Sequence, residues 1–252
     1  MEKLTSGSEA IDNLLNGGYD KTIITVIYGP SSSGKTCLCL LAAIETVKNN
    51  KKVIFVDTEG GFSVERAQQL YSDFPYKLDN FIFFKPTSFQ QQKIALQSIS
   101  LLLSQNIGLI IIDSIAMFYR LEIGLAQDYS EINRELTQQL ISLLKIAREK
   151  EIPILITNQV YADFENRNEV KMVGGDLIKY TSKCIIELKK FSHFRKAIIK
   201  KHLAIEEGKN IDFIIKSDKI DFKDYSVLSE NDDLKPTEWK DEFHYEKRKT
   251  IG

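Results

Sequence analysis

This 252-residue sequence has few cysteines, almost no net charge and no long apolar runs. Its three cysteines are an odd number without metal-ligand spacing, so we expect reduced thiols, as in a cytosolic protein, and no disulfide framework. No stretch approaches the roughly 18 apolar residues of a membrane span, and the N-terminus has no apolar signal region. We therefore expect a soluble protein of the cytoplasm that contacts no membrane.

Net charge and composition exclude further classes. The formal net charge is −1, so a nucleic-acid surface would have to be a local basic patch, because the whole chain exerts no cationic attraction. Hydrophobic residues make up 43% and charged residues 27%, which excludes a disordered or collagen-like chain. The three histidines are dispersed and form neither a zinc pattern nor a catalytic triad.

Apolar β-branched segments alternate with amphipathic ones up to Thr157, which predicts an α/β domain with a mainly parallel twisted sheet flanked by helices. The expected strands are Thr22–Tyr28, Lys52–Val56, Phe81–Phe84, Leu109–Ile112 and Pro153–Thr157. The expected helices are Lys35–Asn49, Ser63–Tyr71, Phe89–Ser104 and Glu131–Lys150. Three later strand segments have no long helices between them, so we expect C-terminal antiparallel hairpins at one sheet edge. These segments are Ile185–Leu188, Ala197–Ile199 and Ile211–Ile215.

The chain from Asp224 onward is charged and poor in aliphatic residues. It holds eight acidic residues against five basic ones. We expect a core domain over residues 1–223 and a poorly ordered tail over residues 224–252. Alternatively, Trp239, Phe243 and Tyr245 anchor this tail to a partner.

Residues 29–36 match the phosphate-binding pattern G-x-x-x-x-G-K-[ST] and lie between a predicted strand and a predicted helix. Glycine permits backbone angles that turn successive N–H groups toward a phosphate, and the helix N-terminus adds partial positive charge. Lys35 would supply a point charge to the β- and γ-phosphates, and the Thr36 hydroxyl would bind Mg²⁺. The alternative is an ordinary Gly/Ser turn, which would not need to lie between a strand and a helix. The residues expected to bind the nucleotide here are Gly29, Pro30, Ser31, Ser32, Ser33, Gly34, Lys35 and Thr36.

Polar residues at three strand ends accompany this loop. Asp113 would hold Mg²⁺ opposite Thr36, although a strand-terminal aspartate can also cap a helix. Glu59 is the candidate that orients or deprotonates an attacking water. Asp57 has a weaker claim, and a solvated acid is the alternative for both. The amides of residues 158 and 159 either sense the γ-phosphate or only form a turn.

Several further short motifs surround these strand ends. They are Thr5-Ser6-Gly7, Leu14-Leu15-Asn16-Gly17-Gly18, Val56-Asp57-Thr58-Glu59-Gly60, Glu65-Arg66, Phe118-Tyr119-Arg120, Ile156–Val160 and Gly174-Gly175. With the phosphate loop, their order resembles the ATPase core of the RecA/RadA recombinase superfamily from about Leu4 to Phe222. Within it the sequence is similar to the archaeal RadB family, which the pair Lys201-His202 followed by Glu207-Gly208 also favours. The resemblance implies a RecA-like P-loop ATPase core.

The same resemblance implies roles and partners. Glu59 would be the catalytic glutamate, Gln159 the γ-phosphate sensor, and Arg66 the guanidinium that stacks on adenine. The cofactors would be ATP and Mg²⁺, with weak hydrolysis, DNA binding and no strand exchange. The implied partners are DNA and a recombinase or branched-DNA nuclease at the nucleoid, and self-association is left open. Only 28 residues precede Gly29, so we expect no N-terminal helix-hairpin-helix domain and no polymerisation linker.

The sequence also departs from the recombinase pattern. The departures are Leu125-Ala126-Gln127 in place of Gly-Arg-Gly in the first DNA loop, a short second loop at Tyr161–Val173, Tyr180 in place of a histidine, and Glu206 in place of a proline. They weaken the expectation of a DNA-driven motor and leave the expected nucleotide pocket intact.

The densest basic segment lies over residues 179–201, with eight lysines and arginines and one opposing acid, Glu187. Phosphate backbones attract such clusters at any sequence. Phe191, His193 and Phe194, at the expected hairpin turn, would stack on single-stranded bases. Alternatively, the lysines solvate an edge hairpin and block aggregation. Arg120 is a separate candidate that could equally form a salt bridge. The residues expected to contact DNA are Arg120, Lys189, Lys190, Arg195 and Lys196.

Three functions follow from these observations. The motifs favour an ATP- and DNA-binding accessory protein of DNA repair and homologous recombination. A recombinase ATPase stimulated by DNA is the second. A KaiC-like nucleotide-switched scaffold, which binds proteins and no DNA, is the third, because the phosphate loop and the strand-end acids serve it equally well.

Overall fold

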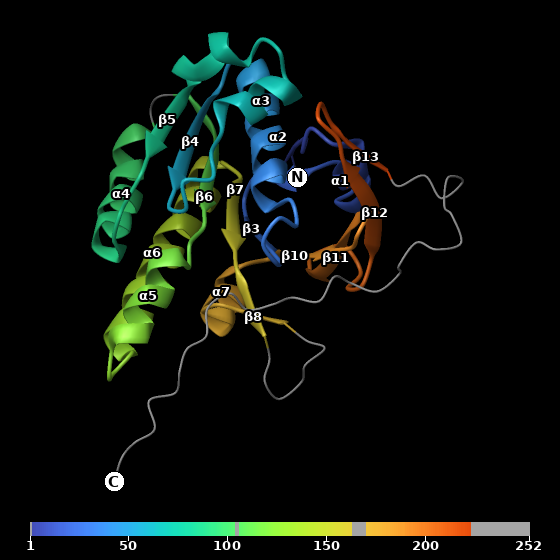
Figure 1. The fold of residues 1–252 in the computed structure, drawn as a ribbon. Coiled ribbons are helices and arrows are strands. Elements are labelled where there is room, and N and C mark those ends of the chain that lie inside the picture. The colour runs from blue at the N-terminus through green and yellow to red at the C-terminus, as the bar shows by residue number, and fades with distance from the viewer. Residues whose placement is uncertain (1, 104–105, 163–169, 223–252) are drawn as a thin grey trace.

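The structure is a computed structural model that describes residues 2–103, 106–162 and 170–222, and its centre is a nine-stranded sheet (Figure 1). The strands are β3 (Ile24–Tyr28), β4 (Lys52–Asp57), β5 (Phe81–Phe84), β6 (Ile107–Asp113), β7 (Ile154–Asn158), β10 (Cys184–Lys190), β11 (Arg195–Lys201), β12 (Asn210–Ile215) and β13 (Ile220–Phe222). Their order is β13-β12-β11-β10-β3-β7-β6-β4-β5. From β10 to β5 all neighbours are parallel, whereas β11, β12 and β13 are antiparallel. The predicted fold class and C-terminal hairpins are confirmed.

Helices cover both faces of the sheet. They are α1 (Glu9–Leu14), α2 (Lys35–Lys48), α3 (Val64–Leu70), the 3₁₀ helix η1 (Phe74–Asn80), α4 (Phe89–Leu102), α5 (Met117–Leu125), α6 (Ser130–Lys150) and α7 (Gly175–Thr181). One apolar core forms beneath α1, α2 and α3, and a second beneath α4 to α7. Two cores result because each parallel strand in the middle of the sheet is buried on both faces.

Strand β6 shows how its sequence produces this arrangement. Leu109 and Ile111 belong to the first core, whereas Ile110 and Ile112 belong to the second. Successive side chains of a strand point to opposite faces, so an uninterrupted apolar run suits a strand between two helical layers. Each such side chain contributes about 1.5–3 kcal/mol by leaving water. The same run carries Asp113 to the carboxyl edge of the sheet.

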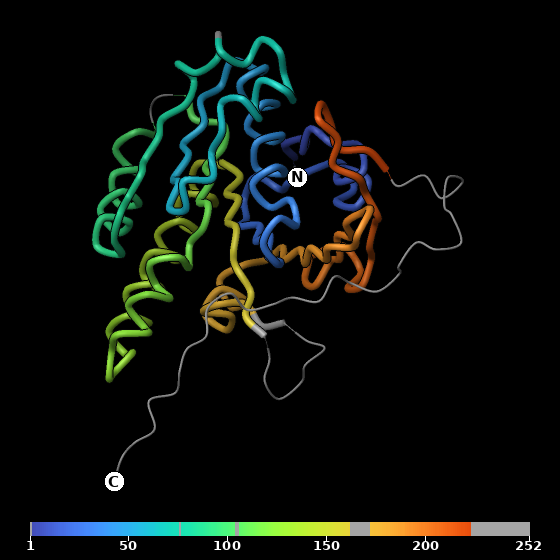
Figure 2. Tube along the Cα trace, viewed as in Figure 1, coloured from blue at the N-terminus to red at the C-terminus, as the bar shows by residue number. Residues whose placement is uncertain are grey.

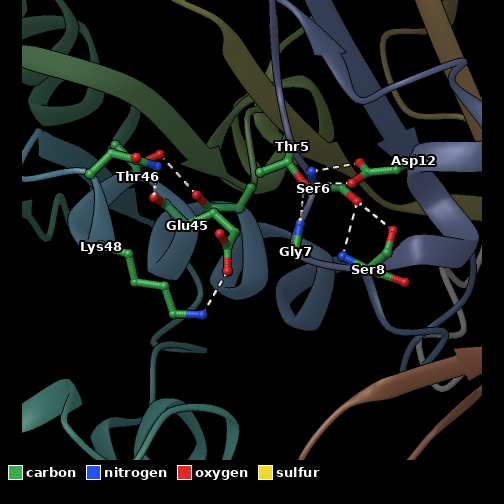
Figure 3. A network of polar contacts seen from close by, with 10 residues as sticks. Thr5, Ser6, Gly7, Ser8, Asp12, Glu45, Thr46 and Lys48 are labelled. Carbon is green, nitrogen blue, oxygen red and sulfur yellow. Dashed lines mark hydrogen bonds and ion pairs between the residues drawn. The ribbon is translucent and has the colours of Figure 1, made fainter.

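Polar contacts fix the N-terminal segment to α1, and the segment also packs closely against α2 (Figure 3). The backbone N–H of Ser6 and the hydroxyl of Thr5 both donate to the Asp12 carboxylate. Gly7 has φ +76°, and a Cβ on it would lie 2.9 Å from the carbonyl oxygen of Leu41 in α2. Only glycine permits this approach, which explains the Thr-Ser-Gly motif as a structural element.

Four short strands lie outside the large sheet. They are β1 (Lys3–Leu4), paired with β2 (Tyr19–Asp20), and β8 (Val160–Ala162), paired with β9 (Val170–Met172). The blue N-terminal segment runs beside the orange and red C-terminal strands, where α1 contacts β12 and β13 (Figure 2). None of the helices in the described ranges combines the length and hydrophobicity needed to cross a bilayer. The predicted tail, residues 224–252, and part of the expected second loop lie outside the described residues.

Candidate functional site

The phosphate loop connects β3 to α2 and lies against the C-terminal strands. A Cβ on Gly29 would lie 2.4 Å from the carbonyl oxygen of Leu188 in β10. Gly34 has φ +107°, and its Cβ would lie 2.7 Å from Cδ1 of Ile215 in β12. Both positions therefore require glycine, as the pattern predicts. The Ser33 hydroxyl is buried in the loop without a hydrogen-bond partner among the described residues.

Lys35 begins α2 and turns its ammonium group back over the loop. It donates to the carbonyl oxygens of Gly29 at 3.0 Å and Pro30 at 2.9 Å. Burial lowers the pKa of Lys35, while the carboxylates of Glu59 and Asp113 oppose this shift. A half-buried cation over glycine-rich backbone at a helix N-terminus is suited to a polyphosphate, whose oxygens accept more strongly than neutral carbonyls.

Asp113 and Thr36 form the second part of the site. The Thr36 hydroxyl donates to Oδ2 of Asp113 at 2.6 Å, and the Thr157 hydroxyl donates to Oδ1. Burial raises the pKa of Asp113, and the two hydroxyl donors oppose this shift. A Cβ on Gly61 would lie 3.7 Å from Oγ1 of Thr36 and 3.8 Å from Oδ2 of Asp113, so glycine leaves room beside them. Two hard oxygen groups beside a phosphate loop fit Mg²⁺.

Glu59 and Gln159 meet at the ends of two different strands. Nε2 of Gln159 donates to Oε1 of Glu59 at 2.9 Å, and the Ser114 hydroxyl donates to the same oxygen at 2.6 Å. The structure thus brings together a carboxylate from the end of β4 and an amide from the end of β7, as the strand-end pattern predicts. Asp57 is differently engaged, because its carboxylate accepts from the backbone N–H groups of residues 61 and 62.

Arg66 lies at the rim of the loop. Its guanidinium donates to the carbonyl oxygens of Lys216 at 2.8 Å and Ser217 at 2.6 Å, and to Sγ of Cys37 at 3.6 Å. It therefore bridges the first turn of α2 and the turn between β12 and β13. This position borders the phosphate loop, and its stacking on adenine stays a prediction.

The basic hairpin does not present its bases on one surface. Lys189 pairs with Lys196, and Lys190 pairs with Arg195. Directly opposite residues share a face and successive residues alternate, so the two pairs lie on opposite faces of the sheet. Lys196 also forms an ion pair with Asp212 at 3.2 Å. The four residues predicted to contact DNA are thus divided, and Arg120 lies on α5.

The hairpin turn corrects one expectation from the sequence. Phe191 and Phe194 are buried and stack on each other, with ring centroids 4.3 Å apart. The Phe191 N–H donates to the Phe194 carbonyl oxygen at 3.0 Å and closes the turn. The interpretation of these rings as an exposed platform for single-stranded bases is therefore wrong. Of the three turn residues proposed for stacking, only His193 is exposed.

Comparison with known proteins connects this geometry to a family. The Rad51 family model matches residues 1–220. A curated DNA repair and recombination protein RadB from Methanococcus maripaludis is 42% identical over 207 residues, which are 81% of this chain and 94% of that protein. The chain belongs to the archaeal RadB family, within the Rad51 family.

Other RadB proteins agree with this assignment. Those of Methanobrevibacter smithii and Methanococcoides burtonii are 40% and 38% identical, and the matches cover 82% and 87% of this chain. They also cover 91% and 97% of those proteins. A solved structure described as "Crystal structure of the RadB recombinase" is 34% identical with a TM-score of 0.76, covering 88% of this chain and 100% of that one. The family is one of DNA repair and recombination proteins, and the predicted RecA-like core is confirmed.

Two hydroxyl groups of this site, those of Ser114 and Thr157, were not predicted from the sequence. Ser114 holds Glu59, and Thr157 holds Asp113. Both belong to motif stretches that were recognised for other residues, Asp113 and Gln159. The sequence did contain a signal for them, because Ser114 directly follows the carboxylate of Asp113 and Thr157 directly precedes the amide of Asn158.

Proposed function

We propose that this RadB-family chain is an ATP- and DNA-binding accessory protein of DNA repair and homologous recombination, with weak ATPase activity and no strand exchange of its own. The observation that carries the proposal is the convergence of Lys35, Thr36, Asp113, Glu59 and Gln159 at the carboxyl ends of β3, β6, β4 and β7. Ligands of open α/β sheets bind at this edge.

Each residue of the site has a proposed task. Lys35 exchanges its two loop carbonyls for phosphate oxygens. Thr36 and Asp113 would hold Mg²⁺, which neutralises phosphate charge when bound. The Glu59 carboxylate positions the attacking water and accepts a proton from it. Gln159 and Ser114 fix its orientation by donating to one oxygen, which leaves the other to the water.

The proposed DNA contact is electrostatic and independent of sequence. Glu187 and Asp212 offset two of the hairpin lysines, because Lys200 lies 3.9 Å from Glu187 and Lys196 lies 3.2 Å from Asp212. We assign most of the DNA attraction to Lys189 and Lys190, the adjacent lysines that directly precede the hairpin turn, with the other predicted bases secondary. A recombinase or branched-DNA nuclease at the nucleoid is the proposed protein partner.

The nucleotide part is tested by measuring the affinity of the wild type and of Lys35→Ala for ATP. We expect Lys35→Ala to lose at least about a hundredfold in affinity, because the phosphates lose a half-buried cation. Its thermal unfolding without nucleotide should stay close to that of the wild type. An unchanged ATP affinity in Lys35→Ala would contradict the assignment of the loop.

The DNA part is tested by fluorescence anisotropy with single- and double-stranded DNA at two salt concentrations. Replacement of Lys189 and Lys190 by alanine should reduce the salt slope by about 2, whereas Lys145→Ala, on the exposed side of α6, should leave it unchanged. If the wild type does not bind DNA at low salt, the proposed DNA binding is contradicted and a scaffold that binds proteins and no DNA is favoured. The rate of phosphate release, with and without single-stranded DNA, separates an accessory protein from a DNA-stimulated motor.

A further inference from the structure

Arg195 lies beside the phosphate loop rather than with the lysines of the opposite face. It pairs directly with Phe213 of β12, so the two side chains share a face of the sheet. On that face Phe213 and Ile215 reach the loop, because a Cβ on Gly34 would lie 4.0 Å from the ring of Phe213 and 2.7 Å from Ile215. The guanidinium is therefore carried toward the start of α2.

The electrostatics of Cys37 agree with this position of Arg195 beside the start of α2. Burial raises the pKa of the Cys37 thiol, and the positive charges of Arg66 and Arg195 oppose that shift. Cys37 directly follows Thr36 in the first turn of α2. The strand register and this effect on Cys37 together put Arg195 on the Cys37 side of the loop.

One N–H group of the Arg195 guanidinium has no acceptor in the described part of the chain. Its Nε is buried and has no hydrogen-bond partner among residues 2–103, 106–162 and 170–222. A buried cationic N–H without an acceptor is costly, and an anion seated between the hairpin and the loop would accept from it.

We propose that Arg195 binds the α-phosphate of a nucleoside di- or triphosphate held by residues 29–36. A guanidinium presents its N–H groups in a fixed fork that matches phosphate oxygens. In phosphate loops the lysine reaches the β- and γ-phosphates, so a second cation on the Cys37 flank meets the α-phosphate. This inference rests on the proposed nucleotide binding and moves Arg195 from the DNA surface to the nucleotide site.

The test compares the dissociation constants of ADP and ATP for the wild type, Arg195→Gln, Arg195→Lys and Arg148→Gln by titration calorimetry. Arg195→Gln should bind both nucleotides about tenfold more weakly and by the same factor, because both carry the α-phosphate. Arg195→Lys should show a smaller loss. Arg148, exposed near the end of α6, is the matched control, and its substitution should leave both constants unchanged.

Several outcomes would overturn the inference. Unchanged ADP and ATP constants in Arg195→Gln, a loss confined to ATP, or a loss of DNA affinity alone would each do so. If Arg195→Gln does not fold, Arg195→Lys decides by the same comparison. A wild type that binds neither nucleotide would remove the proposed function together with the inference, whereas tight wild-type binding that Arg195→Gln retains would remove the inference alone.

Discussion

The three cysteines are buried to different degrees, and burial sets their reactivity. Burial raises the pKa of Cys184 to about 12 and that of Cys39 well above its usual value. Cys37 is only half-buried, and its raised pKa is opposed by two arginines. Because the thiolate is the reactive form, accessible Cys37 should react before the other two.

We predict that a maleimide at pH 8 labels Cys37 in the folded protein and labels Cys39 and Cys184 only after unfolding. Nucleotide at about ten times its dissociation constant should slow the labelling of Cys37 about tenfold, because the occupied loop covers the thiol. Mass spectrometry of labelled peptides checks both statements, and Cys37→Ser is the control. Equal rates with and without nucleotide would contradict the second.

The principal site residues were predictable because their motif encodes local geometry. Lys35 and Thr36 follow a strand and open a helix, and Glu59 and Asp113 end parallel strands, so these side chains had to meet at one edge. The contacts of Arg66 with the turn between β12 and β13 were not predictable. They join residues about 150 positions apart through a sheet order that the local sequence does not state.

At the scale of elements, the phosphate loop depends on its close approach to β10. We predict that Gly29→Ala lowers the free energy of unfolding by about 2 kcal/mol and impairs nucleotide binding, because its Cβ would lie 2.4 Å from a backbone oxygen that cannot move alone. Gly208→Ala is the control for a glycine with positive φ in open space. The Gly208→Ala substitution should lower the free energy of unfolding by about 1 kcal/mol and leave ATP affinity intact. Equal effects on ATP affinity would contradict the role of the contact.

The turn between β10 and β11 gives a second prediction at this scale. Phe194→Ala should lower the free energy of unfolding by about 3 kcal/mol, because the ring is buried against Phe191. Affinity for single-stranded DNA should fall no more than affinity for double-stranded DNA. Urea unfolding and anisotropy measure the two effects. A selective loss of single-stranded binding in a variant of native stability would restore the stacking interpretation.

Every strand and helix expected from the sequence is observed with bounds within two residues, whereas the helices α1, α5 and α7 were not expected. The helix expected over 131–150 is observed over 130–150, because a sustained apolar stripe specifies both its period and its length. Helices α1 and α7 have only six and seven residues, which show little apolar period, although α3, of equal length to α7, was expected. The division of the hairpin bases between two faces was readable from alternation within each strand, whereas the burial of Phe191 depends on its partner across the turn.

At the scale of the molecule, the two ends of the described chain are joined by a small charged cluster. Nε2 of His202, which follows β11, lies 3.3 Å from Oδ2 of Asp20 in β2, and Asp20 also lies 3.7 Å from the Lys3 ammonium in β1. Nδ1 of His202 accepts from the Ala204 N–H at 3.0 Å. This acceptor role requires an unprotonated Nδ1, so the contact favours the neutral ring.

The cluster makes stability depend on pH in a defined direction. Burial lowers the pKa of His202, an effect that Lys3 and Lys209 reinforce and Asp20 opposes. Below pH 6.5 the unfolded chain therefore takes up a proton that the folded ring still resists, and stability falls as the pH drops toward the lowered value. We predict that the wild type loses more free energy of unfolding than His202→Gln between pH 7.5 and pH 5.5. Urea unfolding at both pH values measures this difference. An equal loss of the free energy of unfolding in both proteins would show that His202 is not the source of the pH dependence.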